Sequence, residues 1–313
     1  MEDTYTIILK DKQILSSLCG ANDKNLLYLE KYLGVPVLCK GNELSVVTSD
    51  NEICRKFQHI IDKAVNSSEI KGESSSEYLE SLIATMNTAE DDDFSLGCIH
   101  IPRGIRSVYP KNERQLELIK SIRKNDITFG LGAAGTGKTY LSVASALQML
   151  LSRQVKKIVL TRPVVEAGES LGFLPGDLIQ KITPYLRPLY DSIEYLLPFE
   201  LIKQLEDTKM IEVAPLAYMR GRTLHNAAVI LDEAQNTTKE QMKMFLTRMG
   251  SGSKLIVTGD PGQSDISGSK NSGLSHAVSI LKNINGIGIV EFYASDVVRH
   301  SLVQKIITAY DKE

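Results

Sequence analysis

The sequence has 313 residues, a net charge of -2, a pI near 6.3 and a hydrophobic content of 42%. That length suits one large or two medium domains with a sizeable core, and the charge balance excludes a surface that is basic over the whole protein. The four cysteines lack the spacing of a zinc site or a disulfide framework, and no apolar run reaches membrane-spanning length. We therefore expect a globular protein with a cytoplasmic location and no membrane partner.

Residues 1–66 have the pattern of a small α+β domain. We expect a strand at 4–9, a helix that begins within 22–25 and ends before Gly34, a hairpin of 35–38 and 44–48, and a helix at 53–65. A small sheet with two helices on one face satisfies this pattern. An RNA-binding module of the KH type and an interaction domain without nucleic-acid contact both fit, although the Gly-x-x-Gly loop with which KH modules clamp RNA is missing.

Residues 67–98 are rich in serine and acidic residues, which cluster at 74–76 and 90–93 around a weak helical stretch at 78–86. This composition predicts a solvated linker.

The third segment, 99–313, alternates apolar strands with helical patterns; the strands are expected at 127–131, 157–161, 210–213, 228–232, 254–258 and 287–292. Near-continuous apolar strands separated by helices predict a parallel sheet covered on both faces, with ligands at the carboxyl ends of the strands.

A glycine-rich turn follows the strand at 127–131 and precedes a helical pattern. Its spacing of Gly132, four residues, and Gly137-Lys138-Thr139 is that of a phosphate-binding loop, in which backbone N–H groups and a helix N-terminus surround the phosphates. A chance match in a chain of this length has odds of about one in a hundred. Lys138 is expected to reach the β- and γ-phosphates, and the Thr139 hydroxyl to bind Mg²⁺. The expected nucleotide-binding residues of this segment are Gly132, Ala133, Ala134, Gly135, Thr136, Gly137, Lys138, Thr139 and Tyr140.

Two carboxylates, Asp232 and Glu233, end the apolar strand at 228–232. Beside a phosphate loop, this pattern predicts that Asp232 binds Mg²⁺ and that Glu233 deprotonates the attacking water. Alone, such a pair is often a helix N-terminus that favours acidic residues. The two motifs together favour ATP hydrolysis in a P-loop NTPase of RecA-like α/β fold.

Other polar residues allow two interpretations. Thr258 and Gln263 either hydrogen-bond the γ-phosphate or the attacking water, or belong to an ordinary turn. Arg220, Arg222 and Arg299 are candidate arginine fingers, although an isolated arginine is more often a surface or ion-pair residue. The expected catalytic residues are Glu233, Lys138, Asp232, Arg299, Arg220 and Arg222.

At this level the chain resembles the PhoH-like ATPases, whose core is similar to one motor domain of superfamily 1 RNA/DNA helicases. The segments that carry the resemblance are 129–139, 161–169, 171–177, 220–224, 230–236, 258–260 and 296–300. They cover most of residues 110–310, and residues 1–66 look like the N-terminal domain of the longer family members. Ser301 stands where many members carry proline.

The resemblance implies ATP hydrolysis and assigns further roles. Gln115 is similar to the glutamine with which such helicases read adenine, and Arg299 to the arginine that contacts the γ-phosphate. Thr161, Arg162 and Pro163 are implied to lie on a nucleic-acid face.

The sequence after the linker has room for one motor domain, whereas a helicase closes its ATP site between two. We therefore expect a homo-oligomeric ring in which an arginine acts in trans. The favoured function is an ATPase coupled to single-stranded RNA, in RNA metabolism or ribosome maturation. The alternative is an ATP-dependent switch or scaffold that binds a protein partner through residues 1–66 without unwinding. A small-molecule kinase fits less well, because no arginine-rich lid is evident.

Overall fold

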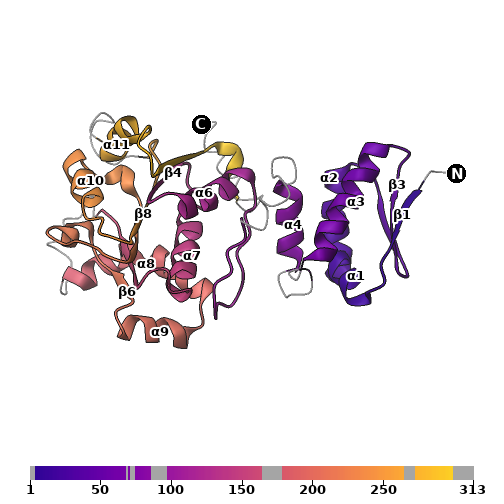
Figure 1. The fold of residues 1–313 in the computed structure, drawn as a ribbon, viewed down its shortest axis with the longest axis horizontal. Coiled ribbons are helices and arrows are strands. Elements are labelled where there is room, and N and C mark those ends of the chain that lie inside the picture. Colours follow the sequence, from indigo (N-terminus) through magenta and orange to yellow (C-terminus); the bar gives the residue numbers. More distant parts are fainter. Residues whose placement is uncertain are drawn as a thin grey trace. The chain divides into compact units, whose positions relative to one another are not determined.

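The computed structural model describes residues 4–67, 70, 75–85, 97–163, 178–263 and 272–298, apart from the side chains of 178–185 (Figure 1). The chain divides into two compact units. The first comprises Met1–Cys98 and Tyr109–Glu113, and the second comprises Ile99–Val108 and Arg114–Glu313. Among the described residues, no helix combines the length and apolar character that a bilayer crossing requires.

The N-terminal unit is a three-stranded antiparallel sheet with helices on one face (Figure 1). Its strands, in the sheet order β1-β3-β2, are β1 (Thr4–Ile8), β2 (Val37–Lys40) and β3 (Glu43–Val47). Its helices are α1 (Lys12–Cys19), the 3-10 turn η1 (Ala21–Asp23), α2 (Lys24–Leu33), α3 (Asn51–Asn66) and α4 (Ser75–Thr85). The expected strands, hairpin and two helices are confirmed, and α1 was not predicted. Its apolar side is short, and its start depends on the Asp11 carboxylate, which caps the N–H groups of Gln13 and Ile14.

The expected linker is wrong for residues 75–85, because these residues form α4 and pack into the N-terminal core. Leu79 and Leu82 are fully buried in that core. Tyr78 lies edge-on to Tyr109, with 5.8 Å between ring centroids, and the Ser81 hydroxyl donates to the Pro110 carbonyl. Apolar side chains one turn apart give α4 a continuous face to bury, so its serine-rich surroundings do not decide its structure.

The second unit contains a six-stranded parallel sheet with the order β6-β5-β7-β8-β4-β9. Its strands are β4 (Ile127–Gly132), β5 (Lys157–Thr161), β6 (Ile211–Val213), β7 (Ala227–Leu231), β8 (Lys254–Gly259) and β9 (Ile287–Phe292). Its described helices are α6 (Glu113–Lys124), α7 (Lys138–Leu151), α8 (Leu178–Leu196), α9 (Phe199–Asp207), α10 (Lys239–Leu246) and α11 (Gly273–Leu281), with 3-10 turns η4 (Leu216–Met219), η5 (Ala234–Asn236) and η7 (Ala294–Asp296). All six predicted strands are confirmed, with boundaries that differ by at most one residue.

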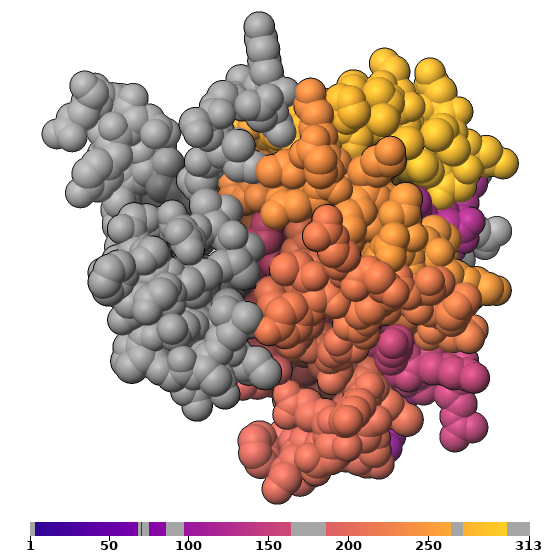
Figure 2. All heavy atoms as spheres, turned by 90° about the vertical axis from the view of Figure 1, so that its left-hand side faces the viewer, coloured from indigo at the N-terminus to yellow at the C-terminus, as the bar shows by residue number. Residues whose placement is uncertain are grey.

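Helices cover both faces of this sheet, as the continuous apolar strands predicted. Ile230 of β7 belongs to a core cluster on one face that also contains residues of α6, α7, α8 and α9. Its neighbours Val229 and Leu231 pack with η4, α10 and α11 on the other. Figure 2 looks onto the side on which α9, in salmon, and the segment that contains η4 and α10, in orange, meet at the surface. The predicted α/β fold of a P-loop NTPase is confirmed.

The strand order brings the predicted motifs together. β8 lies between β4 and β7, and all three strands run in the same direction. Their carboxyl ends therefore reach the same edge of the sheet, where β4 ends at Gly132, β7 leads into Asp232 and β8 leads into Asp260.

We predict that Leu82→Ala lowers the free energy of unfolding of the N-terminal unit by about 2 to 4 kcal/mol, because it leaves a cavity in a core that α4 helps to form. Leu27→Ala, at a side chain that is 62% exposed, should change it by less than about 0.5 kcal/mol. Urea unfolding followed by tyrosine fluorescence measures both, since the chain has 12 tyrosines and no tryptophan. Equal effects of the two variants would show that α4 does not belong to the core.

Candidate active site

The loop between β4 and α7 has glycines with positive φ, and at two of them an added Cβ atom would also clash. Gly132 has φ +128°, and a Cβ atom there would lie 2.2 Å from the carbonyl oxygen of Phe292. Gly137 has φ +87°, and a Cβ atom would lie 2.9 Å from Nε2 of Gln115. Because α7 begins at Lys138, the loop precedes a helix N-terminus, whose free N–H groups and positive dipole end attract anions.

Lys138 is buried within this loop, and its ammonium group is held by the loop's own oxygens. Nζ donates to the carbonyl oxygens of Gly132 and Ala133, both at 2.7 Å, and to Oγ1 of Thr136 at 3.1 Å. Burial lowers the pKa of Lys138, and Asp260, Asp232 and Glu233 oppose that shift through their negative charge. The side chain is thus a charge fixed at the point where the loop closes.

The Asp232 carboxylate is 2% exposed and connects four segments of the unit. Its Oδ1 accepts hydrogen bonds from Oγ1 of Thr139 at 2.8 Å and Oγ1 of Thr258 at 2.6 Å. Its Oδ2 accepts from Nε and Nη2 of Arg162, at 2.9 Å and 2.5 Å. The contacts with Thr139 and Thr258 place the phosphate loop, the end of β8 and Asp232 in one site, as the sequence predicted for Thr139 and Asp232.

Arg162 is the residue of this site whose contacts the sequence analysis missed. It follows β5, in which Thr161 pairs with Leu231 of β7, so it lies beside Asp232. This contact could be found only from the strand order, because Arg162 and Asp232 are 70 residues apart in the sequence. Thr161 and Pro163 are buried, so the described structure does not place them on an exposed nucleic-acid face.

Glu233 differs from Asp232 in being accessible. Its backbone is left-handed, with φ +54°, and its side chain is 48% exposed. Its Oε2 accepts from Nε2 of Gln235 at 2.6 Å, and Oε1 of Gln235 accepts in turn from the Asp260 N–H at 3.0 Å. Nη2 of Arg162 is 3.8 Å from the Glu233 carboxylate. A carboxylate oriented by an amide and open to water has the position that a general base requires.

A cavity of about 300 Å³ joins these groups. Of the predicted nucleotide-binding residues, those that line it are Ala134, Gly135, Gly137, Lys138, Thr139, Tyr140 and Gln263, together with Asp232 and Glu233. Gln115 lies beside the loop rather than in the cavity lining, and its Nε2 donates to the Thr136 carbonyl at 2.9 Å. Gln115 therefore stabilises the loop through this hydrogen bond.

Of the candidate arginine fingers, Arg220 and Arg222 do not line this cavity. Nη1 and Nη2 of Arg222 donate to the two carboxylate oxygens of Glu212, at 2.5 Å and 2.8 Å, and Arg222 thereby lowers the pKa of Glu212. Arg220 is exposed and does not line the cavity. Arg299 and Ser301 lie outside the described residues.

The family described as PhoH-like protein matches residues 107–311. The chain belongs to the PhoH-like family. A PhoH-like protein of Synechocystis sp. is 43% identical over 313 residues, covering 99% of this chain and 95% of that protein. A PhoH-like protein of Bacillus subtilis is 44% identical over 319 residues, with 97% and 96% covered. Membership of the PhoH-like family, together with the loop geometry, identifies a nucleotide-binding ATPase.

Among solved structures, the Sulfolobus solfataricus SWI2/SNF2 ATPase core in complex with dsDNA is 15% identical, with a TM-score of 0.33 over 58% of this chain and 45% of that chain. A likeness at this level adds nothing to the description of this PhoH-like chain. Its fold assignment rests on the six parallel strands and the phosphate loop.

We predict that Lys138→Ala weakens nucleotide binding at least about 100-fold, because the loop loses its charge-assisted bonds to phosphate. In the wild type, affinity should be constant at low pH and fall as pH rises through the lowered pKa of Lys138, before the range in which an exposed lysine titrates. Titration of a fluorescent ATP analogue across pH measures this. Lys138→Arg is the control, since its guanidinium stays protonated and should flatten the profile; the same fall in that variant would contradict the assignment.

Proposed function

We propose that the chain is a Mg²⁺-dependent ATPase of the cytoplasm that couples ATP hydrolysis to the binding or remodelling of RNA. The observation that best supports ATPase activity is a hydrogen bond at the phosphate loop, from Oγ1 of Thr139 to Oδ1 of Asp232 at 2.8 Å. Thr139 and Asp232 are the two residues expected to bind Mg²⁺, and both line the same cavity as Lys138 and Glu233.

The donor set fits magnesium. Mg²⁺ in nucleotide sites is held by one or two carboxylates, substrate phosphates and several waters. The described residues contain no group of three or more His, Cys, Asp or Glu that would hold a metal without phosphate. Thr139 and Asp232 are the residues that would hold the ion, and when bound it would supply positive charge to the phosphates.

The chain's own residues have distinct tasks in hydrolysis. Lys138 and the N–H groups of the loop bind the phosphates and neutralise their charge. Glu233 accepts a proton from water, whose oxygen bonds to the γ-phosphorus while the bond from that phosphorus to the β–γ bridging oxygen breaks. Gln235 orients the Glu233 carboxylate, and Arg162 holds the Asp232 carboxylate beside Thr139.

RNA coupling is supported by the resemblance of the second unit to a helicase motor, and the N-terminal unit offers less. The connection between α1 and α2 is Gly20-Ala21-Asn22-Asp23. Its fourth residue is Asp23, with φ +57°, where a Gly-x-x-Gly clamp has its second glycine. A carboxylate at that point repels a phosphate backbone. We therefore propose that RNA contacts the second unit.

The same observation favours the second candidate, an ATP-dependent switch that binds a protein partner through residues 1–66. Ile8, Leu27 and Leu38 are exposed there by 64%, 62% and 53%.

In either case we propose a homo-oligomeric ring. The described part of the chain brings no arginine other than Arg162 to the cavity lining, and Arg162 is committed to Asp232, so a neighbouring subunit would supply the finger through Arg299 or Arg220.

We predict that the purified protein hydrolyses ATP with Mg²⁺ and that single-stranded RNA stimulates turnover several-fold at about 50 mM salt, with the stimulation lost near 500 mM. Phosphate release measures this, with Lys138→Ala as the control for contaminating ATPases. Turnover that ignores RNA at both salt concentrations would remove RNA coupling and favour the protein-partner switch. No turnover above the Lys138→Ala background would contradict ATP hydrolysis itself.

A further inference from the structure

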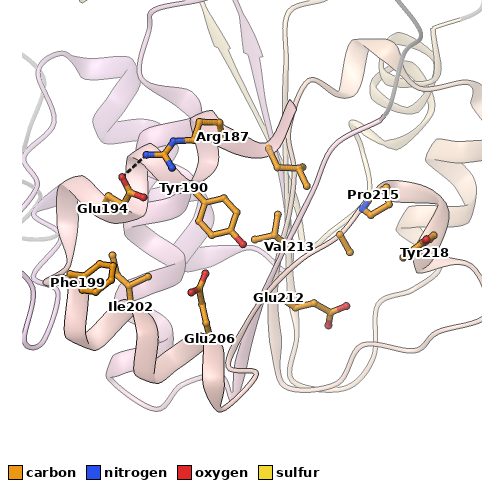
Figure 3. Close-up of a pocket in the computed structure, with 12 residues that line it drawn as sticks. Arg187, Tyr190, Glu194, Phe199, Ile202, Glu206, Glu212, Val213, Pro215 and Tyr218 are labelled. Carbon is orange, nitrogen blue, oxygen red and sulfur yellow. Dashed lines mark hydrogen bonds and ion pairs between the residues drawn. The ribbon is translucent and has the colours of Figure 1, made fainter. Parts of the chain in front are cut away.

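A second cavity of about 510 Å³ lies in the same unit, between α8, α9 and the segment that follows β6 (Figure 3). It shares no lining residue with the cavity at the phosphate loop. Nothing in the proposed hydrolysis of ATP uses it. Its shape and chemistry therefore need a separate explanation.

The position of the cavity follows from two consecutive residues of the strand. Glu212 and Val213 of β6 both line it. Neighbouring residues of a strand point to opposite faces of a sheet, so a cavity that both residues line lies at the sheet's edge. β6 is an outer strand, because β5 is its one partner in the sheet.

The backbone of β6 has hydrogen-bonding groups on this open edge. On the inner side, the Met210 carbonyl accepts from Ile158 N–H at 2.8 Å, and the Ala214 N–H donates to Leu160 at 3.0 Å. Alternation along a parallel strand directs the N–H and C=O groups of Ile211 and Val213 to the other side. An extended polypeptide is the ligand that pairs with alternating donors and acceptors of this kind.

The side-chain lining is apolar and acidic. Phe199 is 73% exposed and Tyr218 is 47% exposed on opposite sides of the cavity, whereas Ile202 beside Phe199 is buried (Figure 3). Aromatic side chains at a cavity give a ligand apolar surface on which to pack.

Three glutamates line the cavity and one arginine accompanies them. Nε of Arg187 donates to Asp191 at 2.7 Å and Nη2 donates to Glu194 at 2.8 Å, so its charge is already compensated. Glu212 is paired with Arg222. No lysine or arginine in the described part of the chain pairs with Glu206, toward which the Tyr190 hydroxyl points (Figure 3). Burial and then Glu206 raise the pKa of Tyr190, so the phenol stays neutral beside this carboxylate.

We propose that this cavity binds an extended segment of a partner protein, which pairs with the open edge of β6 and places a lysine or arginine side chain against Glu206. The aliphatic stem of that side chain packs on Phe199 and Ile202, as amphipathic cations do on apolar surfaces. The edge strand favours a polypeptide, the apolar lining favours an aliphatic stem, and Glu206, which has no cationic partner among the described residues, favours a positive charge.

The test uses the full-length protein and three labelled heptapeptides. The first has the sequence Ser-Val-Thr-Arg-Val-Thr-Ser, the second has glutamate in place of arginine, and the third is the arginine peptide with its internal amides N-methylated. Fluorescence anisotropy should show binding of the first at about 10 to 100 μM, and binding of the other two at least about tenfold weaker.

Two matched variants on α9 separate the cavity from general surface charge. Glu206→Gln should weaken the arginine peptide about fivefold, whereas Glu200→Gln, at an exposed glutamate outside the cavity, should change its affinity by less than about twofold. Unchanged ATP binding in both variants shows that each is folded.

Three results would overturn the proposal. They are equal binding of the arginine and glutamate peptides, no loss on N-methylation, and equal effects of the two variants. Self-association of the protein that the arginine peptide reverses would instead assign this edge to a second copy of the chain. Because ATP turnover is not the readout, failure here leaves the proposed ATPase activity untouched.

Discussion

The buried Asp232 carboxylate holds the parts of the site together. An ionised carboxylate that is 2% exposed is stable only where hydrogen bonds and a positive charge replace its water. Thr139, Thr258 and Arg162 supply these, each from a different segment. These side chains meet only in the strand order β5-β7-β8-β4, so the geometry of the site depends on the fold of the sheet.

The charges around Asp232 also divide the chemistry between two neighbouring carboxylates. Asp232 is enclosed, pairs with Arg162 and accepts a hydrogen bond from Thr139, the residue with which we propose that it holds the cation. Glu233, one residue later, turns outward because its backbone is left-handed, and it meets water. Burial of Lys138 opposes its charge until phosphate arrives, so nucleotide binding and protonation of Lys138 reinforce each other.

Most of the sheet and the loop could be predicted because their signals are local. Apolar runs specify β4 to β9, and the spacing from Gly132 to Thr139 specifies the loop. The missed features depend on contacts distant in the sequence. Arg162 contacts Asp232 only because β5 pairs with β7. Arg222 forms an ion pair with Glu212 instead of lining the cavity at the phosphate loop. Residues 75–85 have a helical pattern, but their burial required a core that composition does not reveal. The open edge of β6 likewise becomes visible only with the strand order.

We propose that Glu233 is the general base of an ATP-hydrolysing site in which Asp232 holds the other groups in place. The most direct measurement compares ATP binding and single-turnover hydrolysis in Glu233→Gln with the matched variant Glu240→Gln, at an exposed glutamate on α10. We expect Glu233→Gln to keep ATP bound with little change in affinity and to slow hydrolysis by about 100-fold or more, because the neutral amide cannot accept the proton. Glu240→Gln should behave as the wild type. Hydrolysis at the wild-type rate in Glu233→Gln would contradict the assignment.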